Sequence, residues 1–258
     1  MAASKSHDNP QRAALITGGA RRIGRAITLA LASAGYAVIV HAHRSRAEAE
    51  QLCGEIAERG GRAAVVLADL AQADQVSRLV PAAAAFGPLT LLVNNACEFE
   101  PDEIGSLERA RFDRTVAVNL RAPLFLAQAF AAQTPAGADA LIVNLLDQRV
   151  LKPTPRFVSY TLTKSALYNA TTTLAQALAP RVRVNAVAPG PVLPSARQTA
   201  EQFARQVAAL PLGRGPGAED IAAAVVYLTT ATSITGQTIA VDGGQHLAWR
   251  TADSDIAE

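Results

Sequence analysis

The 258-residue chain has little of what marks secreted, membrane or nucleic-acid-binding proteins. Its first twelve residues contain no apolar run after their charged positions, and nowhere do eighteen apolar residues follow one another, as a secretion signal or a membrane-spanning helix requires. The formal net charge is only +2, and the basic stripe that binds phosphate backbones is missing. We therefore expect a soluble, cytoplasmic protein that binds neither membrane nor nucleic acid.

Cysteine and histidine are scarce as well. Cys53 and Cys97 lie far apart, with no Cys or His partner at metal-ligand spacing, which predicts reduced thiols and neither a disulfide frame nor a metal site. His41 and His43 alternate along a predicted strand and so point to one face. Two ligands without a third make a poor metal site, and a structural role or a place at the edge of a cofactor site is the better interpretation.

Half of the residues are hydrophobic, and they fall into short runs that alternate with helical stretches. Strands are expected at 13–16, 37–40, 63–67, 89–93, 140–146, 182–187 and 238–241, and helices at 23–34, 47–59, 73–86, in two pieces within 106–133, around 160, at 199–209 and at 218–229. Runs that are apolar on both faces fit parallel strands covered by helices on each side. The sequence thus predicts one α/β domain with a doubly wound sheet over residues 13–250, after a disordered leader at 1–12.

A glycine-rich turn follows the first apolar run. Thr17 to Gly24 would connect the strand to a helix whose free N–H groups and positive dipole end favour an anion. This layout predicts a pyrophosphate cradle. The glycine spacing departs from G-x-G-x-x-G, however, and glycine turns before helices are also ordinary structural punctuation.

The end of the second strand carries the signal for the type of cofactor. In a dinucleotide-binding unit, an acidic residue there binds the 2′-hydroxyl of NAD, whereas arginine accommodates the 2′-phosphate of NADP. This chain has Arg44 and Ser45 at that point and no acid, which favours NADP. The alternative is that Arg44 and Arg46 are ordinary loop charges.

Further polar residues follow the third and fourth strands, where ligands of doubly wound sheets bind. Asp69 would lie near the adenine, and Asn94 to Ala96 near the middle of the cofactor, although asparagine pairs also form turns without any ligand. Asn119 is expected inside a helix, where asparagine is mildly unfavourable and so calls for a reason.

A phenol and an ammonium group are expected one helical turn apart, in Tyr160-x-x-x-Lys164. A free tyrosine has a pKa near ~10, and a nearby cation that lowered it by ~2 units would let it exchange protons at neutral pH. Asp147 comes just after the strand that precedes this helix. Solvated Tyr–Lys pairs and capping aspartates are common alternatives for these residues.

Taken in order, several of these motifs resemble the short-chain dehydrogenase/reductase family. They are Thr17 to Gly24, Asn94 to Ala96, Asn119, Tyr160 with Lys164, Pro189-Gly190 and Asp242-Gly243-Gly244. The resemblance covers about 13–244 and implies a seven-stranded Rossmann sheet, hydride transfer from a nicotinamide cofactor, and a homotetramer built on two helix-pair interfaces.

The resemblance also implies residue roles. Tyr160 would donate or accept the proton, Lys164 would bind the nicotinamide ribose and lower the pKa of the tyrosine, and Asn119 would hold a water molecule in the proton relay. The cofactor site would comprise Gly18, Arg22, Ile23, Gly24, His43, Arg44, Ser45, Asp69, Leu70, Asn95, Ala96, Tyr160, Lys164, Pro189, Gly190 and Val192.

Two departures from the common family pattern resemble the pteridine reductases. Arg22 stands where glycine is usual, and Asp147 stands where a serine is usual, thirteen positions before the tyrosine. The segment from His41 to Ser45 resembles their NADPH-selecting H-x-H-R-S, and Phe99 falls where they stack an aromatic ring on the pterin. By this resemblance, Arg22 would contact cofactor phosphate and the polar edge of the substrate. The alternative for Phe99 is an aromatic residue of the core or of a lid.

The carboxyl group at 147 has a chemical rationale. A serine can only offer a hydroxyl to a carbonyl, whereas a buried carboxyl with a raised pKa can work with Tyr160 to protonate an imine nitrogen. We therefore expect NADPH-dependent reduction of a pterin C=N bond. Alternatives are a carbonyl or alcohol substrate, as in most of the family, and a protein that senses NADP without turnover. The loop 191–212, which would shape the pocket, shows no specificity code.

Overall fold

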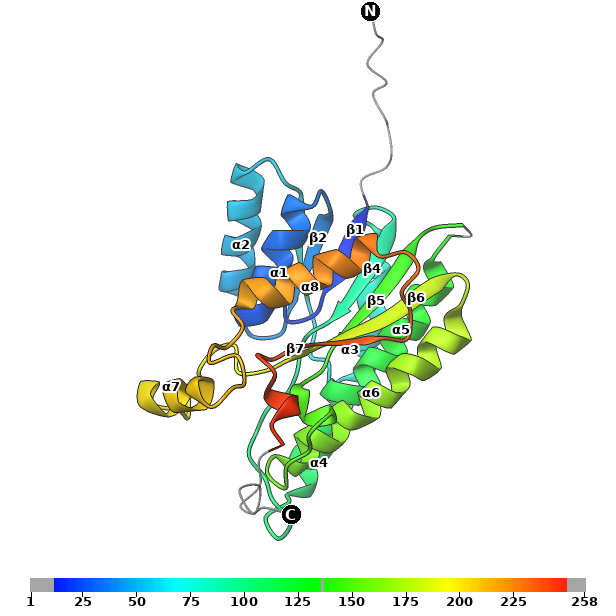
Figure 1. Cartoon of the computed structure of the whole chain (residues 1–258). Coiled ribbons are helices and arrows are strands. Elements are labelled where there is room, and N and C mark those ends of the chain that lie inside the picture. Colours follow the sequence, from blue (N-terminus) through cyan, green and yellow to red (C-terminus); the bar gives the residue numbers. More distant parts are fainter. Residues whose placement is uncertain (1–11, 136, 250–258) are drawn as a thin grey trace, which may run out of the picture.

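The computed structural model describes residues 12–135 and 137–249, and the predicted leader lies outside them except for Arg12. Figure 1 shows a parallel sheet with helices on both faces. The elements are β1 (Ala13–Ile16), α1 (Arg22–Ser33), β2 (Ala37–Ala42), α2 (Arg46–Glu58), β3 (Ala63–Leu67), α3 (Ala73–Ala84), β4 (Leu89–Asn94), α4 (Arg109–Val116), α5 (Ala122–Gln133), β5 (Ala140–Leu145), α6 (Val158–Leu178), β6 (Val182–Pro189), α7 (Ala200–Ala208), α8 (Ala218–Thr230) and β7 (Thr238–Val241).

The seven strands lie in the order β3-β2-β1-β4-β5-β6-β7, and every neighbouring pair is parallel. The chain winds outward from β1 in one direction and from β4 in the other. Ligands of such sheets bind at the carboxyl ends of the strands where this reversal occurs. The predicted doubly wound Rossmann architecture is confirmed, and it places the functional crevice beyond β1 and β4.

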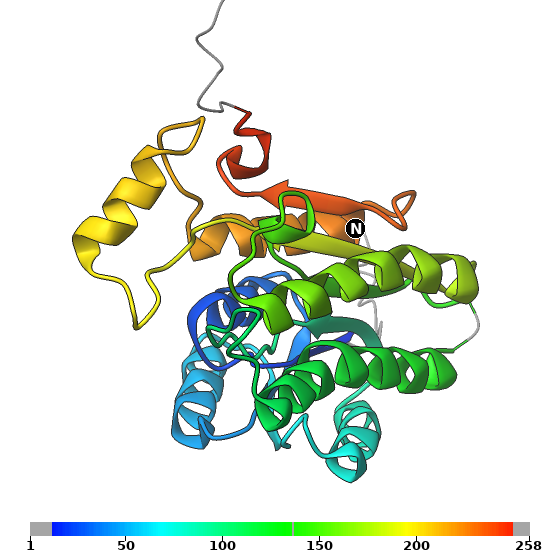
Figure 2. The same ribbon diagram turned by 90° about the horizontal axis from the view of Figure 1, so that it is seen from below.

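The pleat of the strands builds two core layers. Leu15 of β1 packs into a cluster with Leu79 of α3 and Phe130 of α5, whereas its neighbour Ile16 packs with Ile27 of α1 on the other face. Figure 2, seen from below, shows the sheet between these two layers of helices. Full burial of each such side chain stabilises the fold by about 1.5–3 kcal/mol. The strand ends that border the crevice are therefore anchored in a well-packed core.

The predicted pair of helices within 106–133 is one continuous rod, because α4 and α5 are joined by a π-helical turn over Ala117–Arg121. Asn119 lies in this π-helical turn. Such turns are frequent at functional sites, which explains why an asparagine occurs inside the helix. The rod, Arg109–Gln133, is the one helix of the described residues that is long and apolar enough to cross a membrane, and 56% of the apolar window is buried inside the protein. Its apolar composition is explained by its packing on the sheet.

One shifted boundary lies at the pocket. The sixth strand was expected to end at residue 187, but β6 ends at Pro189, which pairs with Val241 of β7. On its other side β5 has already ended, at Leu145 opposite Val187. A proline needs no ladder donor where the neighbouring strand has stopped, so β6 runs two residues past the predicted end.

Candidate active site

Asp147 and Tyr160 meet beyond the end of β5. Asp147 follows that strand directly, and Tyr160 lies in the first turn of α6, where its hydroxyl donates to Asp147 Oδ2 at 3.1 Å. Lys164, one turn further, donates from Nζ to the carbonyl of Leu145 at 2.6 Å. Tyr160 and Lys164 are 6% and 2% exposed, so this polar group is almost closed to bulk solvent.

The expected low pKa of the tyrosine is wrong for this arrangement. Burial, together with the negative charge of Asp147, raises the pKa of Tyr160 well above its usual value of 10. Burial also lowers the pKa of Lys164, and its Nζ lies 5.7 Å from the centre of the Tyr160 ring. The phenol is therefore held protonated in the ligand-free site, and its proton is directed at Asp147.

Arg149 holds the carboxyl group of Asp147 in place. Its Nη1 lies 3.1 Å from Oδ1 and 3.0 Å from Oδ2, and its backbone N–H donates to Oδ1 at 2.9 Å. Asp147 thus caps the short helix Gln148–Val150, in agreement with the capping alternative considered for this residue. Its Oδ2 also accepts from Tyr160, so the residue does both. Nothing in the sequence singled out Arg149.

Asn119 fixes the loop that follows β4. Its Oδ1 accepts from the backbone N–H of Glu98 at 2.8 Å, and its Nδ2 donates to the carbonyl of the same residue at 2.9 Å and to Thr163 Oγ1 at 3.2 Å. The π-turn thereby ties α6 to the loop bearing Phe99.

The glycine turn forms a cradle that leaves no room for a side chain at Gly24. Gly18 has φ +62°, and a Cβ on Gly24 would lie 2.1 Å from the carbonyl oxygen of Gly18. Asn95 stabilises the turn by donating from Nδ2 to the carbonyls of Thr17 and Gly18. No side chain caps the N-terminus of α1, and its first turn has no acid. The free N–H groups and open backbone fit a pyrophosphate.

Arg22 occupies the same turn in a conformation that explains why glycine is usual there. Its φ is +52°, a left-handed conformation that costs a side-chain residue on the order of 1–2 kcal/mol. Its Nη2 donates to the carbonyls of Leu193 and Pro194 at 3.3 and 3.0 Å. The arginine therefore spans from the cradle to the loop after β6.

A cavity of about 350 Å³ extends from the cradle past the ends of β2 and β3. Its wall includes the predicted residues Gly18, His43, Arg44, Ser45, Asp69, Leu70 and Ala96. Arg44 is exposed and ready to bind an anionic group there.

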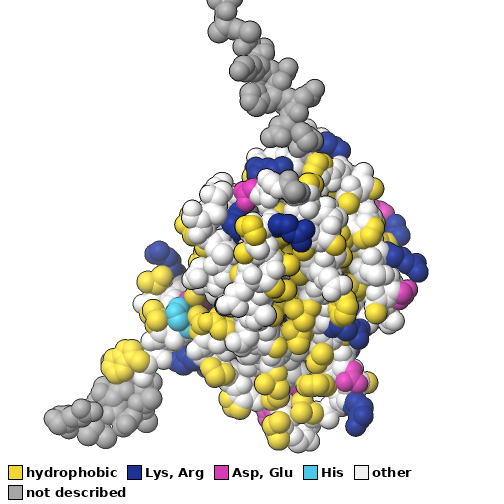
Figure 3. Space-filling view, turned by 90° about the vertical axis from the view of Figure 1, so that its right-hand side faces the viewer, with side chains coloured by type: hydrophobic (Ala, Val, Ile, Leu, Met, Phe, Trp, Pro, Cys, Tyr) yellow, Lys and Arg dark blue, Asp and Glu magenta, His cyan; other side chains and the backbone are white. Residues whose placement is uncertain are grey.

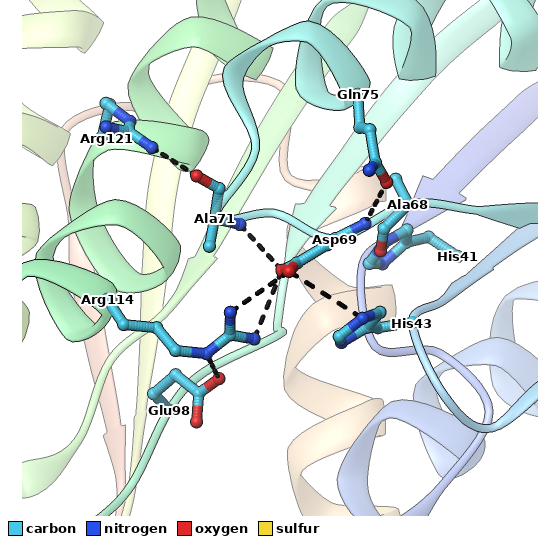
Figure 4. Close-up of polar contacts among 9 residues, drawn as sticks. All are labelled: His41, His43, Ala68, Asp69, Ala71, Gln75, Glu98, Arg114 and Arg121. Carbon is cyan, nitrogen blue, oxygen red and sulfur yellow. Dashed lines mark hydrogen bonds and ion pairs between the residues drawn. The ribbon is translucent and has the colours of Figure 1, made fainter. Parts of the chain in front are cut away.

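Asp69 belongs to an ion-pair network that the sequence did not predict (Figure 4). Arg114 of α4 binds both carboxylate oxygens of Asp69, at 3.1 and 3.2 Å, and also Glu98 at 2.8 Å. Although burial opposes it, the hydrogen bonds from Arg114 and from the N–H of Ala71 keep the pKa of Asp69 below its usual range. The network connects the end of β3 to the loop after β4.

His41 has a structural role, as expected. Its Nδ1 accepts from the N–H of Gly18 at 3.1 Å, so the hydrogen lies on Nε2, 3.1 Å from the carbonyl of Ala68. Burial lowers its pKa to about 4. A neutral imidazole therefore ties the cradle to the end of β3.

A second cavity, of about 660 Å³, lies beside the first and contains the reacting groups. The predicted residues in its wall are Arg22, Ile23, Asn95, Phe99, Asp147, Tyr160, Lys164, Pro189, Gly190 and Val192. Cys97 borders both cavities. The two cavities between them collect every predicted site residue except Gly24 and Asn119.

Phe99 lies against a second aromatic ring that the sequence did not single out. Its ring is parallel to that of Phe157 at a centroid distance of 4.5 Å and meets Tyr160 edge-on at 4.6 Å. Phe157 itself has φ +57° at the start of α6. Since Phe157 covers one face of Phe99, a flat substrate could stack only against the other.

Comparisons with known proteins agree with this geometry. The profile of a family described as Enoyl-(Acyl carrier protein) reductase matches residues 18–246. An uncharacterized oxidoreductase of Methylorubrum extorquens is 37% identical over 90% of this chain and 97% of its own length. The 3-oxoacyl-[acyl-carrier-protein] reductase FabG of Staphylococcus aureus is 33% identical over 92% of this chain and 98% of that protein.

Solved structures give a nearer likeness. The crystal structure of FolM alternative dihydrofolate reductase 1 from Brucella suis, in complex with NADP, is 53% identical, with a TM-score of 0.91 over 93% of this chain and 97% of that chain. A blue fluorescent protein from a metagenomic library, in complex with NADPH, is 33% identical, with a TM-score of 0.84 over 90% of this chain and 97% of that chain. Both neighbours hold the cofactor that Arg44 and Ser45 indicate.

Proposed function

Because the chain belongs to the short-chain dehydrogenase/reductase family and is an NADP-dependent oxidoreductase, we propose that it reduces a C=N bond of a dihydropterin. The observation that carries this proposal is the hydrogen bond of 3.1 Å between Tyr160 and Asp147, where most of the family has a serine. The likeness to the FolM alternative dihydrofolate reductase supports it.

The crevice provides a place for each part of the cofactor. The N-terminus of α1 would bind the pyrophosphate, and Arg44 with Ser45 would bind the 2′-phosphate. Lys164 would bind the nicotinamide ribose, which requires its Nζ to share or exchange the carbonyl of Leu145. When bound, NADPH supplies the hydride.

The chain's own groups supply the proton. Reduction of C=N adds hydride to carbon and a proton to nitrogen, so the site needs a donor that is protonated at neutral pH. Tyr160 borders the cavity and is protonated in the ligand-free site; the bound cofactor and Lys164 would have to bring its high pKa down for efficient proton transfer. Asp147 orients the hydroxyl through Oδ2, and Arg149 holds both oxygens of the carboxylate. Asn119 would hold the relay water near α6.

A carbonyl substrate is the second candidate. It is favoured by the likeness to the 3-oxoacyl-[acyl-carrier-protein] reductase FabG, since a 3-oxoacyl group carries a ketone. The two candidates differ in what they ask of residue 147: a carbonyl needs a hydroxyl donor, whereas a ring nitrogen can use a carboxyl group beside a protonated phenol.

The homotetramer expected of the family is also part of the proposal. Phe125 of α5 and Leu162 of α6 are each 56% exposed, and Figure 3 shows hydrophobic side chains gathered on the side of the molecule where these helices lie in Figure 1. Apolar surface of this kind is typical of subunit contacts. Light scattering of the wild type and of Phe125→Glu would test it, and a wild-type monomer would disprove it.

The functional test is an NADPH-oxidation assay with two panels of substrates. Dihydrobiopterin and dihydrofolate should be reduced, and 3-oxoacyl thioesters and simple ketones should not. Turnover of ketones without pterins would favour the second candidate. Tight binding of NADPH without turnover of either panel would point to the sensor that the sequence left open.

A further inference from the structure

Arg197 bridges the mouth of the larger cavity. It lies in the turn between β6 and α7, and it reaches the loop after β4: Nη2 donates to the carbonyl of Phe99 at 2.8 Å and Nη1 lies 3.1 Å from Glu100 Oε2. Its side chain belongs to the cavity wall. A cation therefore stands where a substrate's outer end would leave the pocket.

The charges of this wall do not balance. Its described charged residues are Arg22, Arg149, Arg197, Lys164 and Asp147. Arg149 is matched by Asp147, Lys164 is assigned to the nicotinamide ribose, and Arg22 donates to the carbonyls of Leu193 and Pro194. Arg197 remains, and its partner Glu100 is not part of the cavity wall. The pocket thus keeps one cation for a negative group of the substrate.

The pair with Glu100 can be exchanged at little cost. The side chains of Arg197 and Glu100 are 41% and 51% exposed, and ion pairs this open to solvent contribute little stability. A guanidinium has five N–H donors, and the contacts with Glu100 and Phe99 use Nη1 and Nη2. Arg197 already holds one carboxylate through Nη1, so a substrate carboxylate can join it at a remaining donor or replace it.

The position of Arg197 relative to Tyr160 suits a substrate tail that is about as long as one aromatic ring. The Phe99 ring separates it from Tyr160: the ring centres of Phe99 and Tyr160 are 4.6 Å apart, and the Arg197 guanidinium carbon is 5.5 Å from the Phe99 centre. It is 5.8 Å from the centre of the stacked Phe157, so it lies beside the two rings and not above a face. Its place is set by its polar partners Glu100 and Phe99.

Resting on the proposed pterin chemistry, we infer that Arg197 binds the carboxylate of an acidic substrate tail. The site then selects dihydropterins that carry an acidic side chain on an aromatic spacer, as dihydrofolate does, over those with a short neutral side chain, such as dihydrobiopterin. Glu100 is a competing internal carboxylate that weakens this selection.

The test is the ratio of kcat/KM for dihydrofolate to kcat/KM for dihydrobiopterin. Arg197→Gln should lower this ratio about five- to tenfold through the KM for dihydrofolate, the loss of one partly exposed charge-assisted contact. Arg197→Lys should recover part of it. Glu100→Gln, which frees the arginine, should raise the ratio. Arg205→Gln, an exposed arginine on α7 outside the cavity wall, is the matched control and should leave it unchanged.

Opposite effects of Arg197→Gln and Glu100→Gln on this ratio distinguish substrate recognition by Arg197 from a purely structural role. If Arg197→Gln changes both substrates equally, or if Glu100→Gln lowers the ratio as Arg197→Gln does, the inference is wrong while the pterin reductase stands. If the wild type reduces neither dihydropterin, the proposed function itself fails.

Discussion

The hydroxyl of Tyr160 donates to Asp147 Oδ2 at 3.1 Å, and this hydrogen bond joins the first turn of α6 to the segment that follows β5. In the ligand-free site the phenol proton is directed at this carboxylate. The contact also explains why the phenol does not have the low pKa expected of a tyrosine next to a lysine, because burial and the adjacent carboxylate both oppose the phenolate. Cofactor and substrate would therefore have to lower this pKa before the proton is transferred.

The tyrosine should remain a phenol far into the alkaline range. We predict that the phenolate absorbance near 295 nm develops equally in the wild type and in Tyr160→Phe through the pH range in which ordinary tyrosines titrate, about pH 10, because the raised pKa of Tyr160 removes it from that titration. Circular dichroism at each pH would verify that the fold is intact. A loss of one tyrosine's amplitude in the variant near pH 10 or below would contradict the assignment.

Arg22 should reveal its strained backbone when two variants are compared. Arg22→Gly and Arg22→Ala both lack the guanidinium, but only glycine is relaxed at φ +52°. We expect the glycine variant to be more stable than the alanine variant by about 1 kcal/mol in urea unfolding. Equal stabilities of the two variants would show that the backbone at position 22 relaxes once the guanidinium is removed, and would contradict the strain. Both should bind NADPH more weakly than the wild type.

His41 should make stability depend on pH in a defined window. Its pKa is about 4 in the folded protein and about 6.5 in an unfolded chain, so unfolding takes up a proton between these values. The stability due to neutral His41 is complete above pH 6.5 and is lost as pH falls toward 4, by about 3 kcal/mol. In urea unfolding at several pH values, His41→Gln should lose less stability than the wild type over this window. Parallel curves would refute the prediction.

Arg44 should decide between the two nicotinamide cofactors. Removing its charge in Arg44→Ala should raise the Kd of NADPH about tenfold or more, since a phosphate contact is lost, and should leave the Kd of NADH nearly unchanged. Fluorescence titration measures both constants, and Arg59→Ala, an exposed arginine at the end of α2, serves as the control. Equal affinities of the wild type for NADPH and NADH would contradict the preference.

The sequence was sufficient for the architecture because the signals there are local. Each apolar run became a strand, and the pattern of turns placed Asp69, Asn95 and Asp147 at strand ends, where the parallel sheet brings them together. Boundaries were missed where the neighbouring strand decides, as at Pro189. The π-turn around Asn119 was signalled only as an unfavourable residue in a helix.

The rest of the site depends on contacts between distant segments. Arg114 reaches Asp69 from 45 residues away, and Arg197 reaches Phe99 from 98 residues away. An arginine in a loop or on a helix surface has no pattern that distinguishes it from a solvated charge. The direction of the Tyr160 pKa failed for a related reason, because burial and the position of Asp147 outweigh the spacing to Lys164.

The most direct test replaces the carboxyl group at 147 by the family's usual hydroxyl or by an amide. The reduction of dihydrobiopterin by NADPH should fall at least a hundredfold in kcat for Asp147→Asn and Asp147→Ser, the size of a lost acid–base partner, while the Kd of NADPH changes less than twofold. A thermal unfolding scan of each variant checks that the unpaired Arg149 has not damaged the fold. Variants that remain folded and keep wild-type turnover of the dihydropterin would contradict the role given to Asp147, and with it the proposed mechanism.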